Sequence, residues 1–192
     1  MCEIRLNKII SPPWLDGGEG FFYTRITDIK WRYYIVFAVG AKIVYPMHGA
    51  GTIQGIEEIK ILGKKKQYYI FKLPYNDMNI MMPVESEELV GVRNIVEKKV
   101  IEDVVGLLRS ESTEMPANWS RRHRENTDKL KTGDIMQVAE VVRNLMRMDR
   151  VRSLSAGERK LLGTARQILA SEMMLTMDIT ENEARNIIEE SV

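Results

Sequence analysis

Cysteine and histidine are almost absent from the sequence, and their scarcity excludes several kinds of site. Cys2 is the only cysteine in the 192 residues, so neither an internal disulfide framework nor a thiolate metal cluster can form. His48 and His123 are the only histidines, which leaves too few ligands for a structural zinc site. A lone thiol suits a reducing compartment, and we expect a cytoplasmic protein.

Long apolar runs and nucleotide-binding motifs are missing as well. No run of about eighteen apolar residues occurs, and Glu3, Pro12 and Asp16 interrupt the N-terminus, so neither a membrane span nor a signal peptide is predicted. The P-loop, dinucleotide-binding, zinc-protease and nucleophile-elbow motifs are also absent. We therefore expect no enzyme, no catalytic residues, no cofactor, no metal and no membrane contact.

The net charge of +1 conceals an uneven distribution of charge along the chain. Between Trp119 and Arg166, twelve Lys/Arg stand against six Asp/Glu, whereas residues 172–190 contain six acidic residues and Arg185 as the only base. A basic segment is compatible with a nucleic-acid face, because clustered cations neutralise phosphates. Charge alone also fits an ordinary solvated helical surface, which is the commoner case.

The pattern of residue types divides the chain into three segments. Residues 1–35 mix proline, glycine and aromatic residues without periodicity, and we expect a dispensable extension that is either a mis-assigned start or disordered. Residues 36–94 contain short apolar stretches between Gly/Pro turns, which predicts a small β-barrel. One turn is expected at residues 48–51, and a hairpin tip at Gly63 with the lysines of 64–66.

From about Glu97 the periodicity becomes that of α-helices, with apolar residues at three- and four-residue steps. Ser155 and Glu158 have the spacing of a capping box, which opens a long helix. Thr180 and Glu183 repeat this spacing before a last short helix. The sequence thus predicts an α+β protein, in which the β-barrel of 36–94 is followed by a compact bundle of about five helices over 97–192.

Two groups of motifs resemble a known family. Residues 37–51 (FAVGAKIVYPMHGAG), with the later Glu57-Glu58 and Gly91-Val92-Arg93, resemble the RNA-polymerase-interacting domain of CarD/CdnL regulators and transcription-repair coupling factors. A second group looks like the helical DNA-contacting domain of CarD/CdnL, which coupling factors lack. This group comprises residues 118–122 (NWSRR), 138–143 (VAEVVR), 154–158 (LSAGE) and 165–169 (ARQIL).

The resemblance implies a function in transcription initiation. The family's Tudor- or SH3-like barrel binds the β subunit of bacterial RNA polymerase, and its helical domain lies at the upstream edge of the melted promoter bubble. There a tryptophan, which matches Trp119, wedges into the minor groove. The family's contacts to the DNA backbone match Arg121, Arg124 and Arg159, with Arg122 adjacent.

Polymerase contacts are expected along an edge of the barrel. The candidate residues are Thr52, Ile59, Lys60, Met78, Ile80 and Met81. An exposed edge strand offers unpaired backbone groups to a partner strand. The chain departs from the family at Ile59 and Met81, where other members often carry arginines for acidic polymerase residues. Lysines at positions 60, 64 and 66 are near enough to supply positive charge instead.

The neighbours of Trp119 fit the implied DNA contact on physical grounds. An indole pressed against an unstacked base step is a known device of minor-groove proteins, and Arg121 and Arg124, three residues apart, share a helix face. Trp119 would alternatively anchor a helix start in the core, although its polar and basic neighbours argue against this. We expect a monomer that binds the polymerase β subunit and promoter DNA with little sequence specificity and stabilises the open complex. The alternative is a polymerase-tethered adaptor whose helical domain binds another protein.

Overall fold

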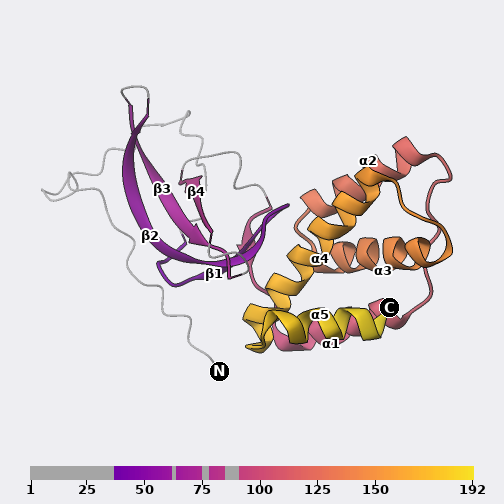
Figure 1. The fold of residues 1–192 in the computed structure, drawn as a ribbon. Coiled ribbons are helices and arrows are strands. Elements are labelled where there is room, and N and C mark those ends of the chain that lie inside the picture. Colours follow the sequence, from indigo (N-terminus) through magenta and orange to yellow (C-terminus); the bar gives the residue numbers. More distant parts are fainter. Residues whose placement is uncertain (1–36, 62–63, 75–77, 85–90) are drawn as a thin grey trace, which may run out of the picture. The chain divides into compact units, whose positions relative to one another are not determined.

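A computed structural model of the chain describes residues 37–61, 64–74, 78–84 and 91–192 (Figure 1). Within these residues five strands are followed by five helices, and this order confirms the predicted α+β class. The strands and helices belong to one compact unit. The extension predicted for residues 1–35 lies outside the described residues.

The strands form one antiparallel sheet with the order β4-β3-β2-β1-β5. Their bounds are Lys42–Tyr45 for β1, Gly49–Ile61 for β2, Lys64–Lys72 for β3, Asn79–Pro83 for β4 and Arg93–Asn94 for β5. In the described part of the chain β4 and β5 are not paired with each other, so the closure of a barrel stays a prediction.

Two of the predicted turns differ from the observed ones. The turn between β1 and β2 covers residues 46–48 instead of 48–51, and its left-handed backbone belongs to Met47 (φ 65°) and Gly49 (φ 101°). Gly49 already starts β2, and a Cβ there would lie 2.6 Å from Ser171 Oγ, so the close approach of the later helix α4 (Ala156–Met177) also favours glycine. The lysines of 64–66 lie on β3, because its pairing with β2 continues to Ile61 opposite Lys64.

One face of the sheet carries an apolar cluster. Tyr69 lies opposite Met82 on β4, and Phe71 lies opposite Ile53 on β2, and all four side chains are almost inaccessible to solvent. The Tyr69 hydroxyl accepts a hydrogen bond from the Phe37 amide at 3.0 Å. Burial of each large apolar side chain contributes about 1.5–3 kcal/mol, so this cluster holds the sheet together.

The helices begin where the sequence offers a cap. Their bounds are Lys98–Arg109 for α1, Trp119–Lys131 for α2, Ile135–Val151 for α3, Ala156–Met177 for α4 and Glu181–Ser191 for α5. Both predicted capping boxes are present, at Ser155 before α4 and at Thr180 before α5. α4 packs against all four other helices, and α1 and α5 lie side by side (Figure 1). The bundle is therefore organised around α4.

The same helix also contributes contacts that join the bundle to the sheet. Glu172 on α4 is fully buried and accepts hydrogen bonds from Arg93 Nη1 at 2.6 Å and Nη2 at 2.9 Å. The amide of Val96 adds a third donor at 3.1 Å, and Ser171 Oγ accepts from the amide of Ala50 at 2.8 Å. The sequence had suggested only an acidic segment here, but Glu172 is a buried partner of the sheet.

Candidate nucleic-acid interface

Trp119 is the first residue of α2, and 49% of its surface is exposed. The helix starts here because the side chain of Asn118 accepts a hydrogen bond from the amide of Arg121 at 3.0 Å, which satisfies one of the free donors of the first turn. A large aromatic side chain at this exposure is not a core residue. The structure thus gives no support to the alternative in which Trp119 anchors the helix start in the core.

The indole is nevertheless held by specific contacts. Its Nε1–H donates to Ser155 Oγ at 2.7 Å, which connects the first residue of α2 to the N-cap of α4. The ring of His123, one turn along α2, stacks against it with centroids 5.8 Å apart and planes inclined by 21°. Trp119 is therefore both exposed and fixed in orientation.

A buried ion pair lies directly behind Ser155. Glu158 Oε2 accepts the Ser155 hydroxyl at 2.7 Å, and Glu158 Oε1 lies 2.6 Å from Arg122 Nη2. Burial by itself would raise the pKa of Glu158, but the hydrogen bonds from Ser155 and Arg122 outweigh it and lower that pKa below its ordinary value. Glu158 is thus held as a carboxylate in the interior.

The burial of Arg122 argues against its predicted contact with DNA. Only 4% of the residue is exposed, and its Nη1 also donates to the carbonyls of Pro116 at 2.8 Å and Ala117 at 3.1 Å. The guanidinium is fully engaged inside the protein, so a phosphate has no access to it. The spacing of Arg122, Asn126 and Leu130, which form the buried stripe of α2, was the signal in the sequence that could have revealed this.

The other three predicted arginines are exposed. Arg121 pairs with Glu125 at 2.7 Å in a largely solvated ion pair, which leaves its charge accessible. Arg121 and Arg124 line one surface pocket together with Asn118 and Ser120. Arg159 lies one turn into α4, and its amide donates to the carbonyl of Ser155. Within the described residues neither Arg124 nor Arg159 has an ion pair, so both charges are available to a ligand.

Two helix N-termini meet beside the indole, because Trp119 starts α2 and contacts the N-cap of α4. A helix N-terminus carries a partial positive charge and unpaired amide groups, both of which favour anions. The exposed arginines add full charges to the same region. This combination suits a polyanion that also offers a flat apolar surface, and a nucleic acid has both properties.

The predicted polymerase-binding residues do not lie on one face of the sheet. Since side chains alternate between the faces of a strand, the pairing of Met81 with Ile70 places Met81 on the face opposite the buried cluster, whereas Ile80 lies on the side of Phe71. By the same alternation Thr52 and Ile59 lie on the outer face with Met81, and Lys60 lies on the inner side. Met81 is 60% exposed on the outer face, whereas Met78, 52% exposed, precedes β4 and is not on that face by the alternation. The outer face therefore contains Thr52, Ile59 and Met81 but not Ile80, Lys60 or Met78.

Other kinds of site find little support in the described part of the chain. It contains no group of three or more His, Cys, Asp or Glu residues that could hold a metal, and none of its helices is both long and apolar enough to cross a membrane. His48 stacks on Tyr45 with centroids 4.7 Å apart, and burial lowers its pKa. His48 is thus part of the packing of the turn.

Comparison with known proteins agrees with the two groups of motifs. Residues 37–96 match the family model of the CarD-like/TRCF RID domain, and residues 103–189 match that of the CarD C-terminal domain. The chain is 36% identical over 151 residues to a protein of Bacillus subtilis (strain 168) named "Putative transcription factor YdeB". The alignment covers 79% of this chain and 99% of the relative. Both regions of the fold are thus matched, in the same order.

Proposed function

This chain belongs to the CarD family, and on that premise we propose that it regulates transcription by binding RNA polymerase through its sheet and promoter DNA through its helices. The carrying observation is Trp119, an exposed indole fixed between two helix N-termini and flanked by the exposed arginines 121, 124 and 159. Arg122 is not part of the proposed contact.

The DNA contact divides between the indole and the arginines. The arginines neutralise phosphates, which positions the protein on the duplex without reading the sequence. The indole stacks against a base step that is already unstacked, so it contributes only where the promoter has begun to open. A protein that binds the open promoter better than the closed one shifts the equilibrium by the difference in affinity. We therefore propose stabilisation of the open complex.

The polymerase contact is proposed at β4 and the adjoining outer face of the sheet. β4 is the end strand of the described sheet, and a partner strand can pair with its outer edge. Met81 and Ile59 face outward there, and Lys66, opposite Ile59, adds positive charge to the same face. The proposed partner surface on the polymerase β subunit is thus apolar with acidic residues.

The decisive experiment uses Trp119→Ala in the full chain. Stacking of a base on an aromatic ring is worth about 1–3 kcal/mol, so we expect the open complex to dissociate about tenfold faster or more, with polymerase binding unchanged. Arg124→Ala and Arg159→Ala should weaken DNA binding. Each should also reduce the slope of the logarithm of the binding constant against the logarithm of the salt concentration by about one unit.

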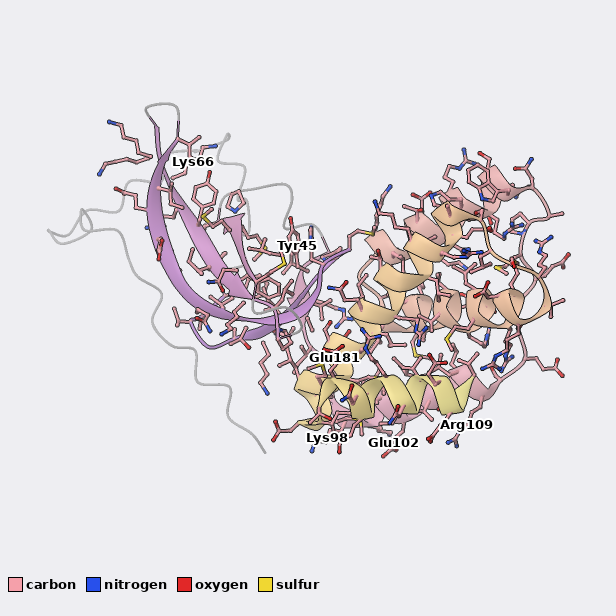
Figure 2. All side chains as sticks on the ribbon, in the orientation of Figure 1. Tyr45, Lys66, Lys98, Glu102, Arg109 and Glu181 are labelled. Atoms are coloured by element: carbon pink, nitrogen blue, oxygen red, sulfur yellow. The ribbon has the colours of Figure 1, made fainter. Side chains whose placement is uncertain are left out.

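Arg109→Ala is the matched control for these arginines. Figure 2 shows Arg109 with Lys98 and Glu102 along the outer side of α1, and the exposed side chain of Arg109 should not affect the salt dependence. If Trp119→Ala left the open complex unchanged while polymerase binding persisted, the protein would instead be an adaptor whose helices bind another protein. Loss of polymerase binding by Trp119→Ala would contradict the proposed division of work between sheet and helices.

A further inference from the structure

We propose that Ser155, backed by the Arg122–Glu158 pair, positions the indole of Trp119 so that its N–H is bound within the protein and the free face and apolar edge of the ring are presented to the DNA. This inference rests on the proposed function. It assigns Ser155 as a positioning residue and identifies the ligand-facing part of the indole. Its consequence is a contact that stacks on bases without reading them through hydrogen bonds.

The direction of each hydrogen bond follows from the chemistry of the groups. Glu158, as a carboxylate, can only accept, so the Ser155 hydroxyl donates its proton to Oε2 at 2.7 Å. The lone pairs of Ser155 Oγ then accept from the indole Nε1–H at 2.7 Å and from the amide of Glu158 at 3.3 Å. The hydroxyl cannot turn its proton toward Trp119 while the carboxylate is present. Nε1–H is the only donor of the indole side chain, and Ser155 occupies it.

The carboxylate is itself fixed by a closed ring of contacts. Arg122 donates to Glu158 Oε1 through Nε at 2.8 Å, and its Nη1 donates to the carbonyls of Pro116 and Ala117. Those carbonyls belong to the segment that leads directly into Trp119, so the contacts run from the indole through α4 and back to the start of α2. Arg122 and Glu158 are 4% and 3% exposed. Water therefore does not compete for the contacts between Arg122 and Glu158.

The remaining surfaces of the indole determine what a ligand can touch. A Cβ added at Gly157 would lie 3.7 Å from Cζ2 of Trp119, so the edge that carries Nε1 and Cζ2 faces the first turn of α4. His123 stacks against one face of the ring. Since the indole is rigid and planar, its other face and the opposite edge, Cε3 and Cζ3, are left for a ligand. Neither offers a hydrogen-bond donor, because Nε1–H is the only donor of the indole.

The test compares the two capping boxes of the chain. Thr180 caps α5 in the same way, with its hydroxyl on Glu183 at 2.8 Å, but it has no part in holding the indole. Ser155→Ala and Thr180→Ala therefore remove the same kind of cap, and only the first frees the indole N–H. Ser155→Thr keeps the hydroxyl and serves as the rescue. Ser155→Gly is the second variant, because glycine is a nearly adequate N-cap and keeps the helix intact.

Two measurements are made on the full chain. The first is hydrogen exchange of the Trp119 indole N–H by NMR, with the signal assigned by its loss in Trp119→Ala. Ser155→Ala and Ser155→Gly should speed this exchange at least several-fold, whereas Ser155→Thr and Thr180→Ala should leave it unchanged. The second is open-complex lifetime with the polymerase holoenzyme on promoters that differ in the base pair at the upstream edge of the bubble. Without the Ser155 hydroxyl, we expect open-complex lifetimes about three- to tenfold shorter. These lifetimes should depend on the base pair at the upstream edge of the bubble, whereas those of the unmodified protein should not.

The outcomes separate this inference from the proposed function. Equal effects of Ser155→Ala and Thr180→Ala on indole exchange would show that Ser155 is only a helix cap, and would overturn the positioning role. Faster exchange with no change in lifetime, although Trp119→Ala shortens it, would overturn the link between indole orientation and DNA contact. If Trp119→Ala itself had no effect on lifetime, the proposed function would fail, and the DNA-facing half of the inference with it. The exchange data would still decide whether Ser155 holds the ring.

Discussion

Replacing Arg93 with alanine should destabilise the protein more than the loss of any solvated charge. The Arg93 guanidinium binds both carboxylate oxygens of Glu172 at the junction between sheet and helices. The Glu172 side chain has no access to solvent, whereas that of Arg93 is 28% exposed. Without Arg93, the carboxylate keeps only the amide of Val96 as a donor. A buried charge is then left without a counter-charge.

The expected magnitude follows from this asymmetry. Removal of one partner of a buried ion pair costs about 3–5 kcal/mol, and the partial exposure of Arg93 places the expected loss near the lower end, at about 3 kcal/mol. The matched control is Arg121→Ala, which breaks the solvated pair with Glu125 and should cost less than about 1 kcal/mol. Replacement of both Arg93 and Glu172 by methionine should be milder than Arg93→Ala, because no buried charge then remains.

Equilibrium unfolding in urea measures these differences. Fluorescence and far-UV circular dichroism are followed together, since coincident transitions show that the sheet and the helices unfold as one unit. We expect coincidence for the unmodified chain and for Arg121→Ala. Arg93→Ala should lower the midpoint and separate the two transitions, because it weakens the contacts that join the two regions. The reasoning is refuted if Arg93→Ala and Arg121→Ala lower the free energy of unfolding equally.

The remaining predictions concern stability and binding. The pKa of Glu158 is lowered from its ordinary value of 4.5, so the ionised carboxyl stabilises the fold above pH 4.5, and this contribution is lost as the pH falls through the lowered pKa. Glu158→Gln should therefore lose less stability than the unmodified protein between pH 6 and pH 3, as measured by urea unfolding at each pH. Gly157→Ala should raise the melting temperature, with a gain of about 0.5–1 kcal/mol, because the new Cβ meets Trp119 and His123 at ordinary contact distance in a helix. Gly49→Ala should lower it, owing to the positive φ and the clash with Ser171. A fragment of residues 36–94 should fold and bind the polymerase β subunit in a pull-down, and binding by the helical fragment in its place would contradict the proposed function.

Local signals in the sequence predicted much of the fold. The capping spacings at Ser155 and Thr180 mark the starts of α4 and α5, because an N-cap and its partner lie within one turn. The strands were recognised from their turns, although the lysines of 64–66 were placed in a tip and not on β3. The register of β2 on β3 decides that point, and register depends on pairing that a single strand does not encode.

Buried charges were beyond a residue-by-residue prediction, because their partners lie far away in the sequence. Arg122 meets Glu158 and Arg93 meets Glu172 only after helices and sheet have packed. The resemblance placed Arg122 with the DNA contacts only because it is adjacent to Arg121 in the sequence, and adjacency does not show which face of a helix a residue occupies. Periodicity carries the missing information, since a charged residue on the apolar stripe of a helix is expected to be buried.

The burial of Arg122 does not weaken the case for a basic surface around Trp119. Arg122 and Glu158 neutralise each other in the interior, so removing both from the surface leaves the excess of positive charge between residues 119 and 166 unchanged. Arg143, buried among Leu107, Ser110 and Asn144, reduces that excess by only one charge. Because Glu158 pairs with Arg122 inside the protein, it does not compete with a ligand for the exposed arginines. One buried pair thus fixes the orientation of the indole and keeps an acidic residue away from the phosphates that the arginines are proposed to bind.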